Sequence, residues 1–102
     1  MNIHAQAAAY VREGWCRGTL QDDDGNVCIA GAINKAISGN PRILCKINID
    51  PDIIRGAAVA KDQLGQTLYD YYQIRHITNW NDKVAESQAE VAYMLDLTAK
   101  HE

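Results

Sequence analysis

The chain of 102 residues lacks the features that mark several classes of protein. It contains no run of roughly 18 apolar residues, which a membrane-spanning helix would need. No basic stretch followed by an apolar run resembles a secretion signal, so we expect a cytoplasmic protein. Its basic residues are scattered and its formal net charge is −3, so binding to nucleic acid through the phosphates is not expected.

Cysteines with the spacing of a metal site are also missing. Cys16, Cys28 and Cys45 are far apart, whereas zinc ligands on one turn are separated by about two to five residues. An odd number of cysteines at wide intervals favours reduced thiols, and a Cys16–Cys28 bridge is the alternative for a protein outside the cytosol. No metal and no cofactor are therefore predicted.

An acidic run at Asp22–Asp24 offers oxygen ligands of the kind that calcium prefers. However, Val27 stands where a calcium-binding EF-hand loop needs glycine, and Ile33 stands where the loop needs a bidentate glutamate. We therefore interpret the run as a solvated turn.

The hydrophobic content of 47% suits one soluble domain over residues 1–102. Apolar residues recur every three to four positions in four stretches, which predicts a mainly α, single-domain bundle of about four helices. The stretches cover about residues 3–13, 28–38, 51 to at least 69, and 87 onward. Between the first two helices an Asp-Gly turn predicts a short hairpin or an irregular loop.

Helix ends are marked by specific residues. Asp50 can cap the third helix and Pro51 fits its first position, while Ser87 and Glu90 have the spacing of a capping box. Gly14 follows the first helix, where we expect a left-handed cap.

The segment 40–49 fits two structures. Asn40 and Pro41 could open a helical turn, whereas an alternation typical of a strand is formed by Ile43, Cys45, Ile47 and Ile49. We expect an extended connector.

Both tryptophans lie at element boundaries and are predicted to be largely buried. Trp15 lies beside glycines, and Trp80 lies between Asn79 and Asn81, ahead of Asp82. In one interpretation these polar residues satisfy backbone groups around a helix start. In the other, they form a polar rim around an aromatic floor that binds a ligand.

Three tyrosines, Tyr69, Tyr71 and Tyr72, occur within four residues near the end of the third helix. They cannot all face one core from a single helix, so at least one should meet solvent. Arg75 and His76 would then complete an aromatic and basic contact surface.

Several elements in order resemble a family of small uncharacterised proteins, a domain of unknown function found in actinobacteria and their phages. The resemblance is carried by Gly14-Trp15-Cys16, Cys28-Ile29-Ala30-Gly31-Ala32-Ile33 and Ile77-Thr78-Asn79-Trp80-Asn81-Asp82. It implies a small, mainly helical, cytoplasmic protein without an assigned activity or cofactor, and with a phage origin in some members.

Two functions are compatible with these observations. The first is a protein-binding module, such as a phage-encoded modulator or inhibitor of a host protein or a homodimer, with Tyr69, Tyr71, Tyr72 and Arg75 as anchors. The alternative is a small enzyme or ligand-binding protein with a pocket near Trp80, Asp82 and His76. Of the two, we favour the binding module.

Overall fold

The structure of the protein is a computed structural model, in which residues 2–101 are described. Within these residues the structure is helical and contains no strand, which confirms the predicted mainly α fold. The helices are α1 (Ile3–Glu13), α2 (Ile29–Ser38), α3 (Pro51–Tyr72), α4 (Ile77–Asn79) and α5 (Gln88–Ala99), with a 3-10 turn η1 (Ile43–Cys45) and a π-helical turn η2 (Trp80–Val84). The short α4 is the helix that the periodicity of the sequence did not predict, because three residues are too few to show one.

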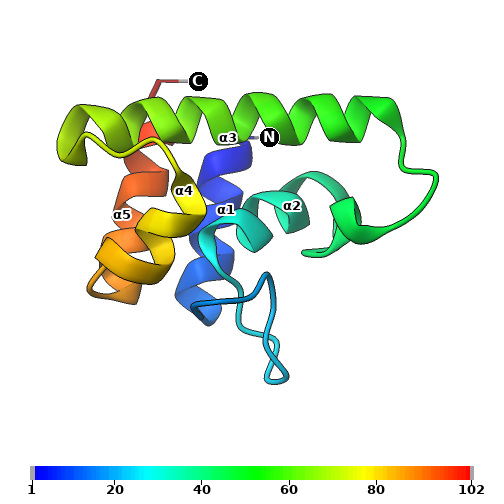
Figure 1. The fold of residues 1–102 in the computed structure, drawn as a ribbon, viewed down its shortest axis with the longest axis horizontal. Coiled ribbons are helices and arrows are strands. Elements are labelled where there is room, and N and C mark those ends of the chain that lie inside the picture. The colour runs from blue at the N-terminus through cyan, green and yellow to red at the C-terminus, as the bar shows by residue number, and fades with distance from the viewer. Residues whose placement is uncertain (1, 102) are drawn as a thin grey trace.

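The long helix α3 lies across one side of the molecule, and the other helices lie beneath it (Figure 1). Helices α1 and α5 run antiparallel. The Asn2 side chain donates a hydrogen bond to the carbonyl of Ala99 at 2.9 Å, and Gln88 donates to the carbonyl of Val11 at 2.6 Å. These contacts join opposite ends of the chain into one unit.

The core lies where α1, α2, α3 and α5 meet. Its largest fully buried apolar side chains are Trp80, Ile29, Ile33, Leu64, Leu68, Met94, Leu95, Val11, Val27 and Val91. The prediction of burial is therefore right for Trp80, whereas Trp15 is only partly buried. No helix within residues 2–101 is both long enough and apolar enough to cross a membrane.

The predicted helix starts are confirmed. The Asp50 side chain caps α3, with Pro51 in the first helical position. At α5 the Ser87 hydroxyl accepts the backbone N–H of Glu90 at 3.2 Å, and the Glu90 carboxylate accepts the N–H of Glu86 at 2.7 Å. Both ends of this capping box are satisfied by groups within four residues, so the sequence pattern was sufficient to find it.

Gly14 ends α1 as expected, but the predicted left-handed cap is wrong because its φ of 173° is extended. The position needs glycine for a different reason, since a Cβ there would lie 2.0 Å from Oδ1 of Asn26. A Cβ on Gly31 would likewise lie 2.1 Å from the carbonyl oxygen of Leu20. The two glycines let the loop between α1 and α2 pack closely against both helices.

That loop is irregular rather than a hairpin. Single bridges join Val27 to Trp15 and to Gln21, and the acidic turn is closed by the N–H of Asp22, which donates to the carbonyl of Asn26 at 3.0 Å. Pairing stops after single residues, so the loop takes the second of the two predicted forms.

The extended connector expected over residues 40–49 is wrong. The N–H of Ile43 donates to the carbonyl of Asn40 at 3.1 Å, so a helical turn follows Asn40 and Pro41. The side chain of Asn34, buried on α2, donates to the carbonyl of Pro41 at 2.9 Å and holds this turn against the helix. The hydrogen bond from Asn34 therefore favours a helical turn over the extended structure that the alternating apolar residues predicted.

Candidate functional site

Asn81 joins the two tryptophan-containing segments. Its Oδ1 accepts the indole N–H of Trp15 at 2.7 Å and the backbone N–H of Ile29 at 3.0 Å. Its Nδ2 donates to the carbonyl of Cys16 at 3.2 Å and to Oδ1 of Asp82 at 2.9 Å. The side chain is fully buried, and all of its hydrogen-bonding capacity is used inside the protein.

Asp82 continues the same junction toward the loop after α1. Besides Asn81, its Oδ1 accepts the backbone N–H of Gly18 at 2.9 Å. From the loop, the guanidinium of Arg17 donates to the carbonyl of Ala85 at 2.6 Å and lies 4.5 Å from the centroid of the Trp15 ring. Asn81 and Asp82 therefore satisfy backbone groups, as one interpretation of the sequence predicted. These groups belong to the start of α2 and to the loop before it, not to the helix that follows Asp82.

Trp80 is fully buried beside Tyr72, with ring centroids 5.3 Å apart. The Tyr72 hydroxyl donates to a carboxylate oxygen of Glu90 at 2.6 Å. Burial and the adjacent Glu90 carboxylate raise the pKa of Tyr72 to about 12. The indole N–H of Trp80 has no hydrogen-bond partner among residues 2–101. These two rings close the end of the core.

Tyr69 and Arg75 form an exposed aromatic and basic pair. The Tyr69 side chain is 43% exposed, and the Arg75 guanidinium lies 4.5 Å from the centroid of its ring. Helix α3 ends in a left-handed residue, Gln73, and the returning chain passes over Gly65, where a Cβ would be 2.9 Å from the carbonyl oxygen of Arg75. This close crossing positions Arg75 over Tyr69.

The other predicted contact residues are separated. Tyr71 is 62% exposed, but residues two positions apart point to different sides of a helix, so it does not share a surface with Tyr69. Tyr72 faces the core. His76 is exposed, and its Nδ1 accepts the backbone N–H of Asn79 at 3.2 Å at the start of α4. The expectation that at least one tyrosine meets solvent is confirmed.

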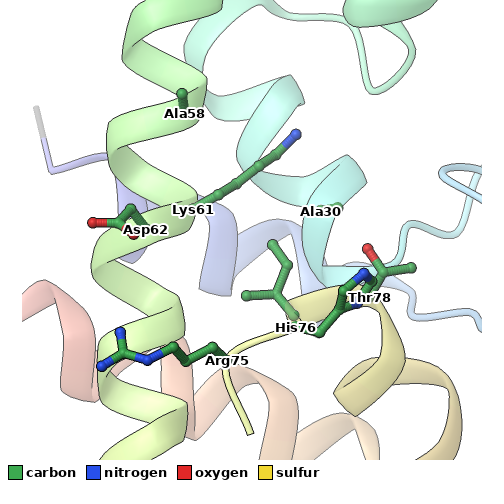
Figure 2. Close-up of a pocket in the computed structure, with 8 residues that line it drawn as sticks. Ala30, Ala58, Lys61, Asp62, Arg75, His76 and Thr78 are labelled. Atoms are coloured by element: carbon green, nitrogen blue, oxygen red, sulfur yellow. The ribbon is translucent and has the colours of Figure 1, made fainter.

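A cleft of about 360 Å³ lies between α3, the start of α4 and the side of α2 (Figure 2). It is lined by Ala30, Ala58, Lys61, Asp62, Arg75, His76, Ile77 and Thr78. Of the three residues predicted to surround a pocket, His76 lines this cleft, whereas Trp80 is buried in the core and Asp82 is hydrogen-bonded to Asn81 and Gly18.

Lys61 is a charged residue of this cleft that no motif in the sequence indicated. It is partly buried, and this burial lowers its pKa because the ammonium loses hydration. On a helical wheel Lys61 lies beside Ala57 and Leu64, which belong to the apolar side of α3. A lysine at the edge of an apolar stripe is the feature of the sequence that could have indicated a partly buried cation.

The three cysteines are free thiols. The sulfur of Cys28 is buried at the start of α2 and accepts the N–H of Gly31 at 3.3 Å, while Cys45 is exposed. Burial raises the pKa of Cys28 and of Cys16, which makes both thiols poor nucleophiles at neutral pH. The part of the chain that the structure describes contains no group of three or more His, Cys, Asp or Glu residues placed to hold a metal ion.

Comparison with known proteins places the chain in a family. Residues 2–101 match the family described as "Family of unknown function (DUF6197)". The chain belongs to this family. The region that matches DUF6197 therefore includes the buried junction, the Tyr69–Arg75 pair and the cleft. No curated protein and no solved structure matches the chain, so the geometry of this DUF6197 member carries the functional argument alone.

Proposed function

We propose that this member of DUF6197 is a protein-binding module that uses the Tyr69–Arg75 pair as its central contact. The observation that carries the proposal is the stacking of an exposed guanidinium on an exposed tyrosine ring, 4.5 Å from the ring centroid. Tyrosine and arginine are enriched among the residues that contribute most to protein interfaces. The pair is ordered before binding, which reduces the entropy lost when a partner arrives.

The surroundings of the pair support a surface for contact with another protein. Tyr69 lies on the side of α3 that also carries Asp62, one of the residues lining the cleft. Arg75 belongs both to the pair and to the lining of the cleft. In a phage setting the partner would be a host protein whose activity is modulated when its surface is occupied, and a second copy of the chain is the competing occupant.

The test combines affinity capture with measurement of mass in solution. Tagged wild type and Tyr69→Ala are used to capture proteins from a lysate of the source cells, and the captured proteins are identified by mass spectrometry. Tyr93→Ala is the matched control, because Tyr93 is also an exposed helical tyrosine (56%) but lies on α5. We expect loss of an interface tyrosine to weaken capture by about tenfold or more and the control to retain it.

Light scattering of the isolated protein separates the two occupants. A dimer that Tyr69→Ala dissociates would identify a second copy as the partner. A monomer that captures nothing at micromolar concentration, or a partner retained equally by Tyr69→Ala, would refute the assignment of this pair.

A further inference from the structure

The cleft beside α3 has an apolar floor. Ala30 on α2, Ala58 on α3 and Ile77 on α4 contribute to its lining, and its volume is about 360 Å³. It is open to solvent on one side, so a small molecule or the end of a flexible segment could enter without movement of the helices. The space is too small for a large ligand and suits a short apolar group.

Lys61 supplies an uncompensated positive charge at this floor. Figure 2 shows its side chain reaching from α3 toward α2, whereas Asp62 and Arg75 extend in the opposite direction. Among residues 2–101 its ammonium makes no ion pair and no hydrogen bond with the protein, although the side chain is partly buried. A partly desolvated ammonium without a partner gains more from an incoming anion than one in bulk water does.

Two neutral donors lie in the same lining. Because Nδ1 of His76 accepts the N–H of Asn79, the neutral ring carries its proton on Nε2, which is then free to donate. The hydroxyl of Thr78 has no partner within the described chain and can donate as well. These two donors lie together at the start of α4, whereas the Lys61 side chain reaches toward α2 (Figure 2).

The charges of the lining define how much negative charge the cleft can hold. Lys61 and Arg75 are positive and Asp62 is negative, which leaves a single net positive charge with neutral His76. Arg75 is already stacked on Tyr69, so Lys61 is the available cation. This balance favours a singly charged carboxylate over a phosphate dianion.

We propose that the cleft binds a small monocarboxylate that carries a short apolar chain. The carboxylate pairs with Lys61, while the apolar chain rests on the alanines and Ile77 and extends toward His76 and Thr78. This site does not depend on the protein-binding function proposed above, because its cation is Lys61, which is not part of the Tyr69–Arg75 pair.

The test uses isovalerate as the probe, because it combines one carboxylate with a short branched chain. Titration is followed by the amide resonances of the ¹⁵N-labelled protein at constant ionic strength. We expect saturable shifts at Ala30, Ile77 and Thr78 with a dissociation constant on the order of millimolar. Isovaleramide, which has the same shape without the charge, should bind at least tenfold more weakly.

Three variants assign the charge to one residue. Lys61→Gln should weaken isovalerate binding about tenfold, while Lys61→Arg, which retains the charge, should bind within a few-fold of wild type. Lys83→Gln is the matched control, since Lys83 is an exposed lysine on η2 outside the lining of the cleft. Lys61→Gln should leave protein capture intact, because Lys61 is not part of the Tyr69–Arg75 pair, and this result separates the site from the protein interface.

Four results would overturn the proposal. They are no saturable shift at about 50 mM probe (roughly fifty times a dissociation constant of about 1 mM), equal binding of the acid and its amide, tighter binding of inorganic phosphate than of isovalerate, and unchanged binding by Lys61→Gln.

Discussion

Replacing Asn81 by alanine tests whether the junction between the two tryptophan segments holds the fold together. The substitution removes the acceptor for the indole N–H of Trp15 and for the backbone N–H of Ile29, and the donor to the carbonyl of Cys16. A hydrogen bond contributes about 1 kcal/mol net, and a buried group left without a partner costs up to about 3 kcal/mol. The amide of Ile29 is buried, so we expect a total loss of about 3 to 5 kcal/mol.

The measurement is urea-induced unfolding followed by far-ultraviolet circular dichroism, which reports the helical content directly. A loss of this size is a large part of the stability of a small domain, about 5 to 15 kcal/mol, so the midpoint should fall markedly. Asn79→Ala is the matched control on the other side of Trp80. The Asn79 side chain is exposed and makes no hydrogen bond within the described residues, so its removal should change stability by less than about 0.5 kcal/mol.

The reasoning would be refuted by an Asn81→Ala protein that loses less than about 1 kcal/mol, or that loses no more than Asn79→Ala. Either result would mean that water replaces the lost partners and that the two segments dock through apolar contacts alone.

Three further predictions follow from the packing. Gly31→Ala should destabilise the protein by about 1 to 3 kcal/mol through overpacking, whereas Gly56→Ala, whose added Cβ meets nothing closer than 3.9 Å, should stabilise it by up to about 1 kcal/mol in thermal unfolding. Trp80→Ala should cost about 3 to 5 kcal/mol in the same assay, and unchanged melting would contradict burial of its ring. Because the folded-state pKa of Tyr72 is raised to about 12, the stability gained from its neutral form is full below pH 10.0 and is lost as the pH rises through about 12. The difference in unfolding free energy between wild type and Tyr72→Phe should therefore shrink over this range, and a constant difference would contradict the contact with Glu90.

Local signals in the sequence determined most of the helices. The caps of α3 and α5 join groups no more than four residues apart, and the apolar periodicity of α1, α2 and α3 is a property of each segment alone. The exposure of tyrosines near the end of α3 followed in the same way, because three rings within four residues point in different directions. These features needed no knowledge of how the helices pack.

Tertiary structure decided the features that depend on distant parts of the chain. Asn81 accepts from residues that are 52 and 66 positions away in sequence, so no local pattern could show that one side chain joins both tryptophan segments. Gly14 was expected to adopt a left-handed conformation, but it is extended and gives room to Asn26, which only the folded loop brings near. Capping hydrogen bonds form within one helical turn and can be recognised from neighbouring residues. The contacts of Asn81 and of Gly14 form only when the helices and the loop have packed together.

The cleft depends on packing in the same way. Lys61 on α3 and His76 before α4 belong to separate segments, and the chain brings them to one lining because it crosses α3 closely at Gly65. The sequence predicted a pocket formed by His76 with Trp80 and Asp82, which are its near neighbours in the chain. Burial drew Trp80 into the core and backbone hydrogen bonds drew Asp82 to Gly18, so three neighbours in sequence were divided between the interior and the surface. The physical reason is that the chain is helical from α4 through η2, so these three side chains point to different sides, and only the surrounding helices determine which side is buried.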